Sequence, residues 1–369
     1  MYSPSPVAVV LDLKHLRQLG TVFWIGVAAV EASGTGPFTA IAPVPAGDRW
    51  MYSNNPTPGN RATASTFSFL PSGGVDDRFG QFIIKFDTTA MGIPAGLGKE
   101  NYDVHRLILT AIYASNDSVP YDPTEDSLAS LGSAPTRADL DAGRPLELHG
   151  TGFRGGFTAA TFQEASPYGS RNAFASSFDV AGSARDVSNN VTLGDESQPW
   201  AIGEITPTGG LPLVSGDIIP VYARVNFEIN LGILGVADYV KHGLNQGFLW
   251  FTLSSFHPVS GPGSSGFPAY FTKEHPEQAI YHDVAPTLKT EYSLPLQIVG
   301  FQRDPTGNVR LTWNGSPGFQ YTVESKEGLG IGVWSPLGTF TTATPVSLNW
   351  SGNSSSSRAF FRVSRSSLP

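Results

Sequence analysis

Glycine and proline are spread through the whole chain, and they set the tightest limit on how it can fold. They supply 41 and 29 of the 369 residues, close to a fifth of the sequence. Both residues interrupt helices, proline because it lacks a backbone N–H and glycine because of its backbone freedom. Charged residues make up only 15% of the chain, and this composition excludes coiled coils and helical bundles. Short strands separated by turns are the structure that such a sequence favours.

The aromatic residues show that the chain can still build a large core. It contains 23 Phe, 12 Tyr and 7 Trp, which argues against disorder. Cysteine is absent, which excludes a disulfide scaffold, a thiolate zinc site and a cysteine nucleophile. The net charge of -8 argues against a nucleic-acid partner, because such binding needs a basic face. We therefore expect a globular, β-rich protein that is long enough for two domains.

The first residues have the layout of a secretory signal. Leu19–Val30 (LGTVFWIGVAAV) is free of charge and follows a basic segment, and it is shorter than the ~20 residues that span a bilayer. Val30 and Ala32 put an apolar and a small residue at the two positions that a signal peptidase reads, so we expect cleavage after Ala32. The pattern predicts a signal peptide over residues 1–32, a linker over 33–45 and a secreted protein, extracellular or at the cell surface, without a membrane span. A buried N-terminal strand is the alternative interpretation.

Strand patterns dominate the region that follows, which we interpret as one domain over residues 46–293. Val225, Phe227 and Ile229 alternate with polar residues, as in a half-buried strand. Residues 248–256 (FLWFTLSSF) form an almost wholly apolar run, which is typical of a strand buried on both faces. The remaining strand segments of this region are 81–86, 106–113 and 287–299.

A helix and a long irregular segment complete this domain. Apolar residues at helical spacing from Val236 to Leu244, followed by Gly247, predict a short helix. Between about 116 and 217 the strand pattern fades into Gly-, Ser-, Asp- and Pro-rich sequence with isolated aromatic residues. Because long structureless loops are uncommon inside a domain, we expect an ordered insertion with short strands that packs across the sandwich.

The last part of the chain has a different texture, with short alternating segments at regular spacing. Turn-forming clusters of Gly, Pro, Asn and Ser separate the segments, which is the signature of a small β-sandwich. We predict this second domain over residues 296–366. The fold prediction is therefore all-β: a jelly-roll-like β-sandwich with a long insertion, followed by a small fibronectin- or immunoglobulin-like β-sandwich.

Two groups of acidic residues suggest chemistry. Asp122, Glu125 and Asp126 lie close together near Pro123, and crowded oxygen ligands in a rigid turn suit calcium. The alternative is an Asp-Pro turn before an acidic helix start. A second group within the insertion could supply the two carboxyl groups that acid–base catalysis on a polysaccharide needs, and it comprises Glu147, Glu164, Asp179 and Asp186.

A third segment contains Glu and His but lacks the spacing of a metal-binding motif. Lys273-Glu274-His275 resembles part of a metalloprotease motif, but the histidine spacing is wrong and Pro276 would break the required helix.

Aromatic residues in loop-like settings suggest a binding surface. Trp50, Tyr52, Tyr168 and Trp200 sit among Asn, Asp, Ser, Pro and Gly. Sugars bind proteins by laying their apolar ring faces on Trp and Tyr, while polar groups fix the orientation. These four residues are therefore candidate ligands for a polysaccharide or a cell-surface glycan. The alternative is that they fasten the insertion onto the sandwich.

Several segments of the first domain resemble the disaggregatase-related DNRLRE family of β-sandwich modules, which are linked to carbohydrate binding. The segments that carry this resemblance are Asp48–Tyr52, Asn60-Arg61, Arg78–Asp87, Ile93–Gly96, Leu107–Thr110, Phe271–Glu274 and Ala285–Leu288. The middle of the domain departs from the family and is similar to blocks in secreted proteins of environmental bacteria.

The end of the chain resembles the fibronectin-like accessory domains of exported bacterial proteins. The residues that carry this second resemblance are Tyr321, Val323, Ser325, Trp334, Leu337 and Phe360–Val363.

These observations predict a secreted, non-catalytic protein that binds polysaccharide, with calcium as a candidate ligand. Two alternatives stay open. One is a structural or adhesive protein of the cell surface, and the other is a polysaccharide lyase or hydrolase that uses carboxylates of the insertion.

Overall fold

The computed structural model describes most of the chain after residue 37. The described residues are 38–55, 57–69, 77–125, 142–188, 198–205, 213–259, 266–294, 296, 298–304, 306–315, 319–326, 333–343, 346–353 and 360–367. The segment predicted to be a signal peptide, 1–32, and residue Asp126 lie outside this part of the chain. The chain divides into two compact units. Residues 39–93 and 104–292 form the large unit, and the small unit contains the described part of 293–369.

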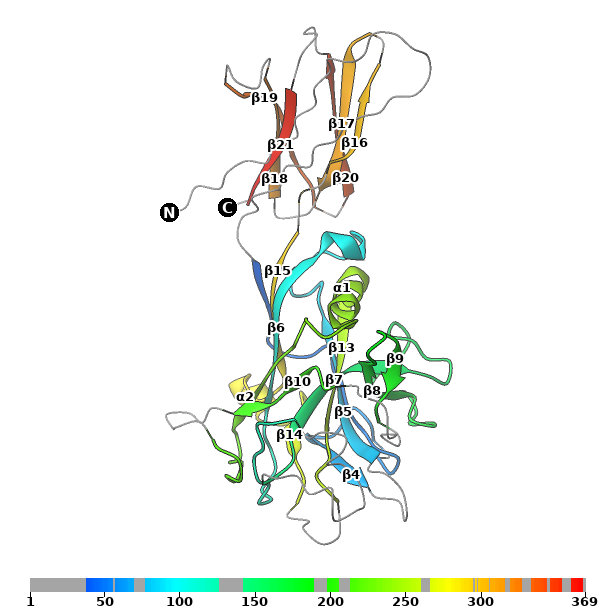
Figure 1. Ribbon diagram of the computed structural model, residues 1–369. Helices are drawn as coiled ribbons and strands as arrows, with labels where there is room; N and C mark the ends of the chain where they lie inside the picture. The colour runs from blue at the N-terminus through cyan, green and yellow to red at the C-terminus, as the bar shows by residue number, and fades with distance from the viewer. Residues whose placement is uncertain are drawn as a thin grey trace. The chain divides into compact units, whose positions relative to one another are not determined.

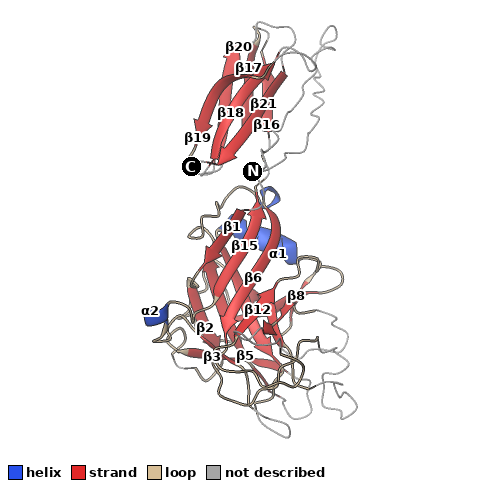
Figure 2. Cartoon of the chain, turned by 90° about the vertical axis from the view of Figure 1, so that its left-hand side faces the viewer, coloured by secondary structure: helices blue, strands red, loops and turns tan. Residues whose placement is uncertain are grey.

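The large unit is a sandwich of two β-sheets (Figure 1). One sheet, seen face on in Figure 2, has the strand order β1 (Phe38–Ala42), β15 (Thr287–Ser293), β6 (Asp103–Ile112), β12 (Arg224–Glu228) and β11 (Glu204–Ile205). The other, which we call the large sheet, has the order β2 (Gly47–Met51), β5 (Asp77–Asp87), β13 (Phe248–Ser255), β7 (Leu146–Phe153), β8 (Ala173–Phe178) and β9 (Ala184–Asp186).

Shorter strands extend these sheets. β4 (Phe67–Phe69) pairs with β5, and β10 (Ala201–Ile202) pairs with β7. A separate two-stranded sheet consists of β3 (Thr63–Ser65) and β14 (Ala269–Phe271).

Alternating apolar residues of both sheets form the core between them. In the large sheet, Leu253 lies opposite both Phe82 and Leu148, so the three side chains point to the same side. In the facing sheet, Phe227 lies opposite Leu109. All five side chains are fully buried. The predicted all-β sandwich is confirmed.

The opposite face of the large sheet is also covered. Residues 154–172, between β7 and β8, place Phe162 against Ile83 and Trp250 of the sheet. The indole N–H of Trp250 donates a hydrogen bond to the carbonyl of Ala159 at 2.9 Å. β13 is consequently buried along almost its whole length, as its apolar run predicts. We call residues 154–172 the outer cover.

The predicted helix is confirmed as α1 (Val236–Gln246), which buries Val236, Val240 and Leu244. Gly247 ends it with φ of 90°, a conformation that favours glycine. The described part of the chain has two further short helical segments, α2 (Gln278–Tyr281) and the 3₁₀ turn η1 (Lys99–Asn101).

Two segments are more regular than the sequence indicates. Residues 116–217 supply β7, which lies between β13 and β8, so this part of the chain is built into the large sheet. The predicted linker 33–45 contains β1, which pairs with β15 and buries Ala40 and Ala42. The linker prediction is therefore wrong for 38–42, because the small alternating side chains there fit a sheet.

The small unit is a second sandwich of two three-stranded sheets. Its first sheet has the order β16 (Ile298–Arg303), β17 (Asn308–Gly315) and β20 (Val346–Asn353), and its second has the order β19 (Ser335–Thr341), β18 (Phe319–Lys326) and β21 (Phe360–Ser367). Trp313, Tyr321 and Val323 are fully buried in its core. This arrangement agrees with the small β-sandwich that the sequence predicts for this part of the chain.

Among the described residues, no helix has the length and apolar character needed to cross a membrane.

A close approach between Gly150 and Trp200 yields a test of the packing. A Cβ atom on Gly150 would lie 2.1 Å from the buried ring of Trp200. We expect Gly150→Ala to destabilise the protein by about 1–3 kcal/mol, because the indole has no room to move. Thermal unfolding followed by circular dichroism measures the effect. The additional change Trp200→Phe should recover part of the loss, whereas Gly232→Ala, on an exposed turn, should have little effect. If the losses in stability caused by Gly150→Ala and Trp200→Phe simply added in the double variant, the close approach of the two residues would be contradicted.

His257 makes the stability depend on pH. The residue is 3% exposed and its Nε2 lies 3.1 Å from the carbonyl oxygen of Arg144. Burial lowers the pKa of His257 from 6.5 to about 4. The neutral ring therefore contributes stability above about pH 6.5, and this contribution is lost as the pH falls towards 4. Chemical denaturation at several pH values should show a loss of up to about 3 kcal/mol from this group.

Replacing the histidine isolates its contribution. His257→Gln keeps an N–H donor for the Arg144 carbonyl and should flatten the pH dependence between about 6.5 and 4. His242→Gln, on the exposed side of α1, serves as the control. An unchanged slope in His257→Gln would show that other groups cause the acid sensitivity.

Candidate functional site

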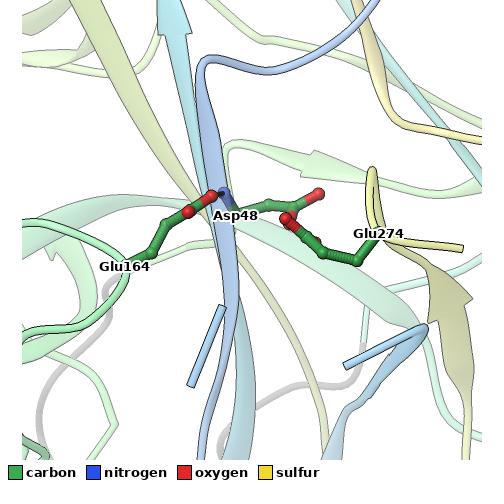
Figure 3. A group of neighbouring side chains, drawn as sticks. All are labelled: Asp48, Glu164 and Glu274. Atoms are coloured by element: carbon green, nitrogen blue, oxygen red, sulfur yellow. Dashed lines mark hydrogen bonds between the residues drawn. The ribbon is translucent and has the colours of Figure 1, made fainter. Parts of the chain in front are cut away.

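Three carboxyl groups meet at the free edge of the large sheet. Asp48 lies on β2, Glu164 lies in the outer cover, and Glu274 follows β14. One carboxylate oxygen of each residue lies within 4.8 Å of one oxygen of each of the others. Figure 3 shows the side chains of Glu164 and Glu274 reaching Asp48 from opposite sides of the strand. We call these three residues the carboxylate cluster.

The outer cover positions Glu164. The Arg49 guanidinium donates hydrogen bonds to the backbone carbonyls of Glu164, at 2.9 Å, and of Ser166. The Glu164 carboxylate accepts the backbone N–H of Asp48 at 2.7 Å. Gly59, with φ of 75°, lets the chain approach, since a Cβ there would lie 2.7 Å from the Glu164 Cβ. These contacts fix the carboxylate against the edge strand.

The segment after β14 positions Glu274. The backbone N–H of Lys273 donates to Asp48 Oδ2 at 2.9 Å, and the backbone N–H of Thr272 donates to the carbonyl of Ala62. The Lys273 ammonium group lies 2.6 Å from Glu164 Oε1 and also contacts Glu274 Oε1. One lysine thus bridges the two glutamates on either side of β2.

The electrostatics of the cluster are dominated by the burial of Asp48, which is 1% exposed. Burial is the main cause that raises the pKa of Asp48 to about 8. A hydrogen bond with Glu274 and the negative charge of Glu274 raise it further. With both groups ionised, Asp48 Oδ1 and Glu274 Oε2 are buried and have no hydrogen-bond donor. Carboxylate oxygens can only accept hydrogen bonds, so two of them need a proton or a cation between them.

An aromatic pair lies next to the cluster. Trp50 is two residues after Asp48 on β2, so both side chains point to the same face. The rings of Trp50 and Tyr52 stack at 4.9 Å with an interplanar angle of 19°. Phe67 and Phe79 contact the Tyr52 ring edge to face. Trp50 and Tyr52 are both half-buried, so part of the pair is open to solvent.

Polar side chains of the following turn surround this pair. The Asn54 side chain donates to the Tyr52 hydroxyl at 3.4 Å, and the Asn55 side chain donates to the carbonyl of Trp50 at 3.1 Å. Arg61 donates to the Asn55 side chain at 3.1 Å. The face therefore combines stacked rings with amide, guanidinium and carboxylate groups.

The other two aromatic candidates lie elsewhere. Tyr168 is half-buried in the outer cover and packs on the cluster of Phe162 and Trp250, as the alternative of a fastening role predicts. Trp200 is 1% exposed; its ring stacks on Phe178 and its N–H donates to Ser177 at 3.2 Å. The prediction of a surface ring is wrong for Trp200, because the glycine at 150 leaves room to bury it.

The predicted calcium residues do not come together as a set of ligands in the described part of the chain. Asp122 is fully buried, and its Oδ1 accepts the backbone N–H and the hydroxyl of Thr124, each at 2.8 Å. These bonds form a turn at Asp122-Pro123, the first part of the alternative interpretation, whereas its acidic helix start falls outside the described residues. Glu125 is exposed, and Asp126 lies outside the described residues.

Three of the four acidic residues considered for catalysis form ion pairs with arginine. Glu147 is bidentate with Arg78 at 2.6 and 2.9 Å. Burial alone would raise the pKa of Glu147, but the charge and the hydrogen bonds of Arg78 outweigh it and hold the pKa well below its usual range. The other two pairs are Asp179–Arg185 and Asp186–Arg154.

Glu164, the fourth, is the one that joins other carboxylates. Sequence reasoning considers Glu164 and Glu274 separately and gives no reason to bring them together. The one local signal is Asp48, a carboxylate that shares one face of β2 with Trp50.

The chain matches no protein-family model, no curated protein and no solved structure at a level that would establish a relationship.

Lys273 provides a test of this geometry. Lys273→Met removes the ammonium group that Glu164 and Glu274 share, and should destabilise the protein by about 1–2 kcal/mol, since both carboxylates are partly desolvated. Adding Glu164→Gln should restore part of the loss. Lys289→Met, which breaks a single pair with Glu291 and removes a lysine that is 41% exposed, against 21% for Lys273, is the matched control and should destabilise the protein less. Equal losses from the two lysine variants, measured by chemical denaturation, would contradict the bridging role.

Proposed function

We propose that the protein is secreted and binds polysaccharide without catalysis, through the face formed by Trp50, Tyr52 and the polar groups beside them. The observation that carries this proposal is the stacked and partly exposed Trp50–Tyr52 pair. Aromatic faces bind the apolar side of sugar rings, and polar groups around them bind the hydroxyls. The resemblance to DNRLRE modules and the signal-like segment 1–32 point in the same direction.

The pair is supported from below, which favours binding. Phe67 and Phe79 hold the Tyr52 ring at 5.4 and 5.6 Å, and Phe67 also contacts Trp50 at 6.3 Å. Rings that are already ordered lose little side-chain entropy when a ligand binds. The arrangement suits a neutral or weakly charged glycan chain, whose hydroxyl groups can donate to the partly exposed carboxylates of Glu164 and Glu274.

The test is binding to a panel of polysaccharides, on a glycan array and by affinity electrophoresis, with and without millimolar calcium. Trp50→Ala and Tyr52→Ala should each weaken binding about tenfold or more, the loss that roughly 1–2 kcal/mol of ring contact corresponds to. Circular dichroism should show that both variants are folded.

Tyr281→Ala serves as the control, because Tyr281 is an aromatic residue of α2 that is 64% exposed. It should leave glycan affinity unchanged. Absence of binding to every polysaccharide, or equal losses in all three variants, would overturn the proposal. A stable oligomer without glycan affinity in light scattering would favour the structural or adhesive alternative.

A further inference from the structure

We infer that Asp48, Glu164 and Glu274 form a binding site for a divalent cation, and that calcium is the cation whose chemistry fits it. The cluster by itself would not justify this inference, because acidic side chains often gather without an ion. The reason lies in two buried oxygen atoms of the cluster that have no protein donor when both carboxyl groups are ionised.

Asp48 Oδ1 and Glu274 Oε2 are buried and accept no hydrogen bond (Figure 3). Asp48 as a whole is 1% exposed. Leaving a buried charged acceptor unsatisfied costs more than leaving a neutral one, typically several kcal/mol. A positive ligand aimed at these two oxygens would remove that cost.

Both donor groups of Lys273, the cation beside the cluster, are already engaged with other atoms. The Lys273 ammonium group contacts the Oε1 atoms of Glu164 and Glu274, and the Lys273 backbone N–H binds Asp48 Oδ2. The Arg49 guanidinium binds the carbonyls of Glu164 and Ser166. The donors of Lys273 are thus used elsewhere, so Asp48 Oδ1 and Glu274 Oε2 need either a proton shared between them or a cation from outside the protein, and calcium binding distinguishes the two.

The spacing fits one calcium ion. Calcium binds oxygen at about 2.3–2.6 Å, so two ligands on opposite sides of the ion lie up to about 5 Å apart. The three carboxylates of the cluster each offer an oxygen within 4.8 Å of the other two. Calcium takes six to eight oxygen ligands in flexible geometry, and the partly exposed side chains of Glu164 and Glu274 leave a side open for water.

The donor set also discriminates between metals. It consists of carboxylate oxygens, which suit calcium, magnesium or manganese more than zinc or copper. His275 follows Glu274, but its Nδ1 accepts the backbone N–H of Glu277 at 3.3 Å. Magnesium demands near-ideal octahedral geometry at about 2.0–2.1 Å and keeps several waters, so the flexible coordination of calcium suits carboxylates from three separate segments better.

The test is isothermal titration of the full chain with calcium chloride after removal of bound metal with a chelator, and no sugar present. We expect one ion per chain with a Kd below about 1 mM, the range of extracellular calcium modules. Terbium(III) provides a second readout, because Trp50, two residues from Asp48, should sensitise its emission. Magnesium should compete for the terbium site less well than calcium.

Two variants separate a cation site from a purely structural ion-pair network. Glu274→Gln, at a partly exposed position, should weaken calcium binding about tenfold or more by removing one charged ligand. Lys273→Met should tighten it about tenfold, because the ammonium group competes with the ion. In a structural network, Lys273→Met would lower the melting temperature and calcium would not restore it.

Matched controls are Glu125→Gln, in the turn that the sequence marks as a calcium candidate, and Glu228→Gln, in an exposed pair with Arg106. Both should bind calcium as the unmodified protein does. The inference is overturned if the unmodified protein binds no calcium at about 10 mM, if Glu274→Gln binds it unchanged, or if Glu125→Gln abolishes binding. Because no glycan is used, these results are independent of the glycan proposal.

Discussion

The central strand β13 of the large sheet is buried on both faces, and most of the large unit depends on this constraint. Antiparallel sheets usually leave one face to solvent, but β13 is apolar on both sides and therefore needs two covers. One cover is the facing sheet, and the other is the outer cover, which packs Phe162 on Trp250. The hydrogen bond from Trp250 to Ala159 ties this loop to the strand below it. The segment between β7 and β8 is long enough to shield this face of the sheet from solvent.

Covering that face has a consequence at the sheet edge. An edge strand exposes backbone donors and acceptors that must be satisfied or shielded, and Glu164 accepts the N–H of Asp48 on β2. The same contact brings one carboxylate next to another, since the Asp48 side chain is buried beside Glu274. Lys273 neutralises part of the charge from one side. Closing the edge of the sheet therefore brings the three carboxylates together, and their mutual repulsion is unfavourable.

Sequence patterns predict the elements of this protein better than they predict its site. The alternation in 224–228, the apolar run of β13 and the helical spacing of α1 each reflect burial of a single element, and a pattern within one segment records such burial. The four candidate aromatic residues look alike in sequence, yet the structure stacks Trp50 at the surface and buries Trp200. The difference arises from Gly150 of β7, where the missing side chain leaves room for the Trp200 ring.

The carboxylate cluster was beyond such reasoning because its members belong to three separate segments of the chain. Because the members are far apart in sequence, a ligand shared by them would affect the stability of all three segments. A ligand that binds Asp48, Glu164 and Glu274 only in the folded state stabilises β2, the outer cover and the segment after β14 together. A chain without cysteine cannot obtain such a restraint from a disulfide. A restraint made of oxygen ligands differs in being reversible and in following the concentration of free ion. It would stiffen the strand that carries the Trp50–Tyr52 pair, and a stiffer pair loses less entropy when a glycan binds. In this way the inferred cation and the proposed glycan surface become linked through β2, although neither requires the other.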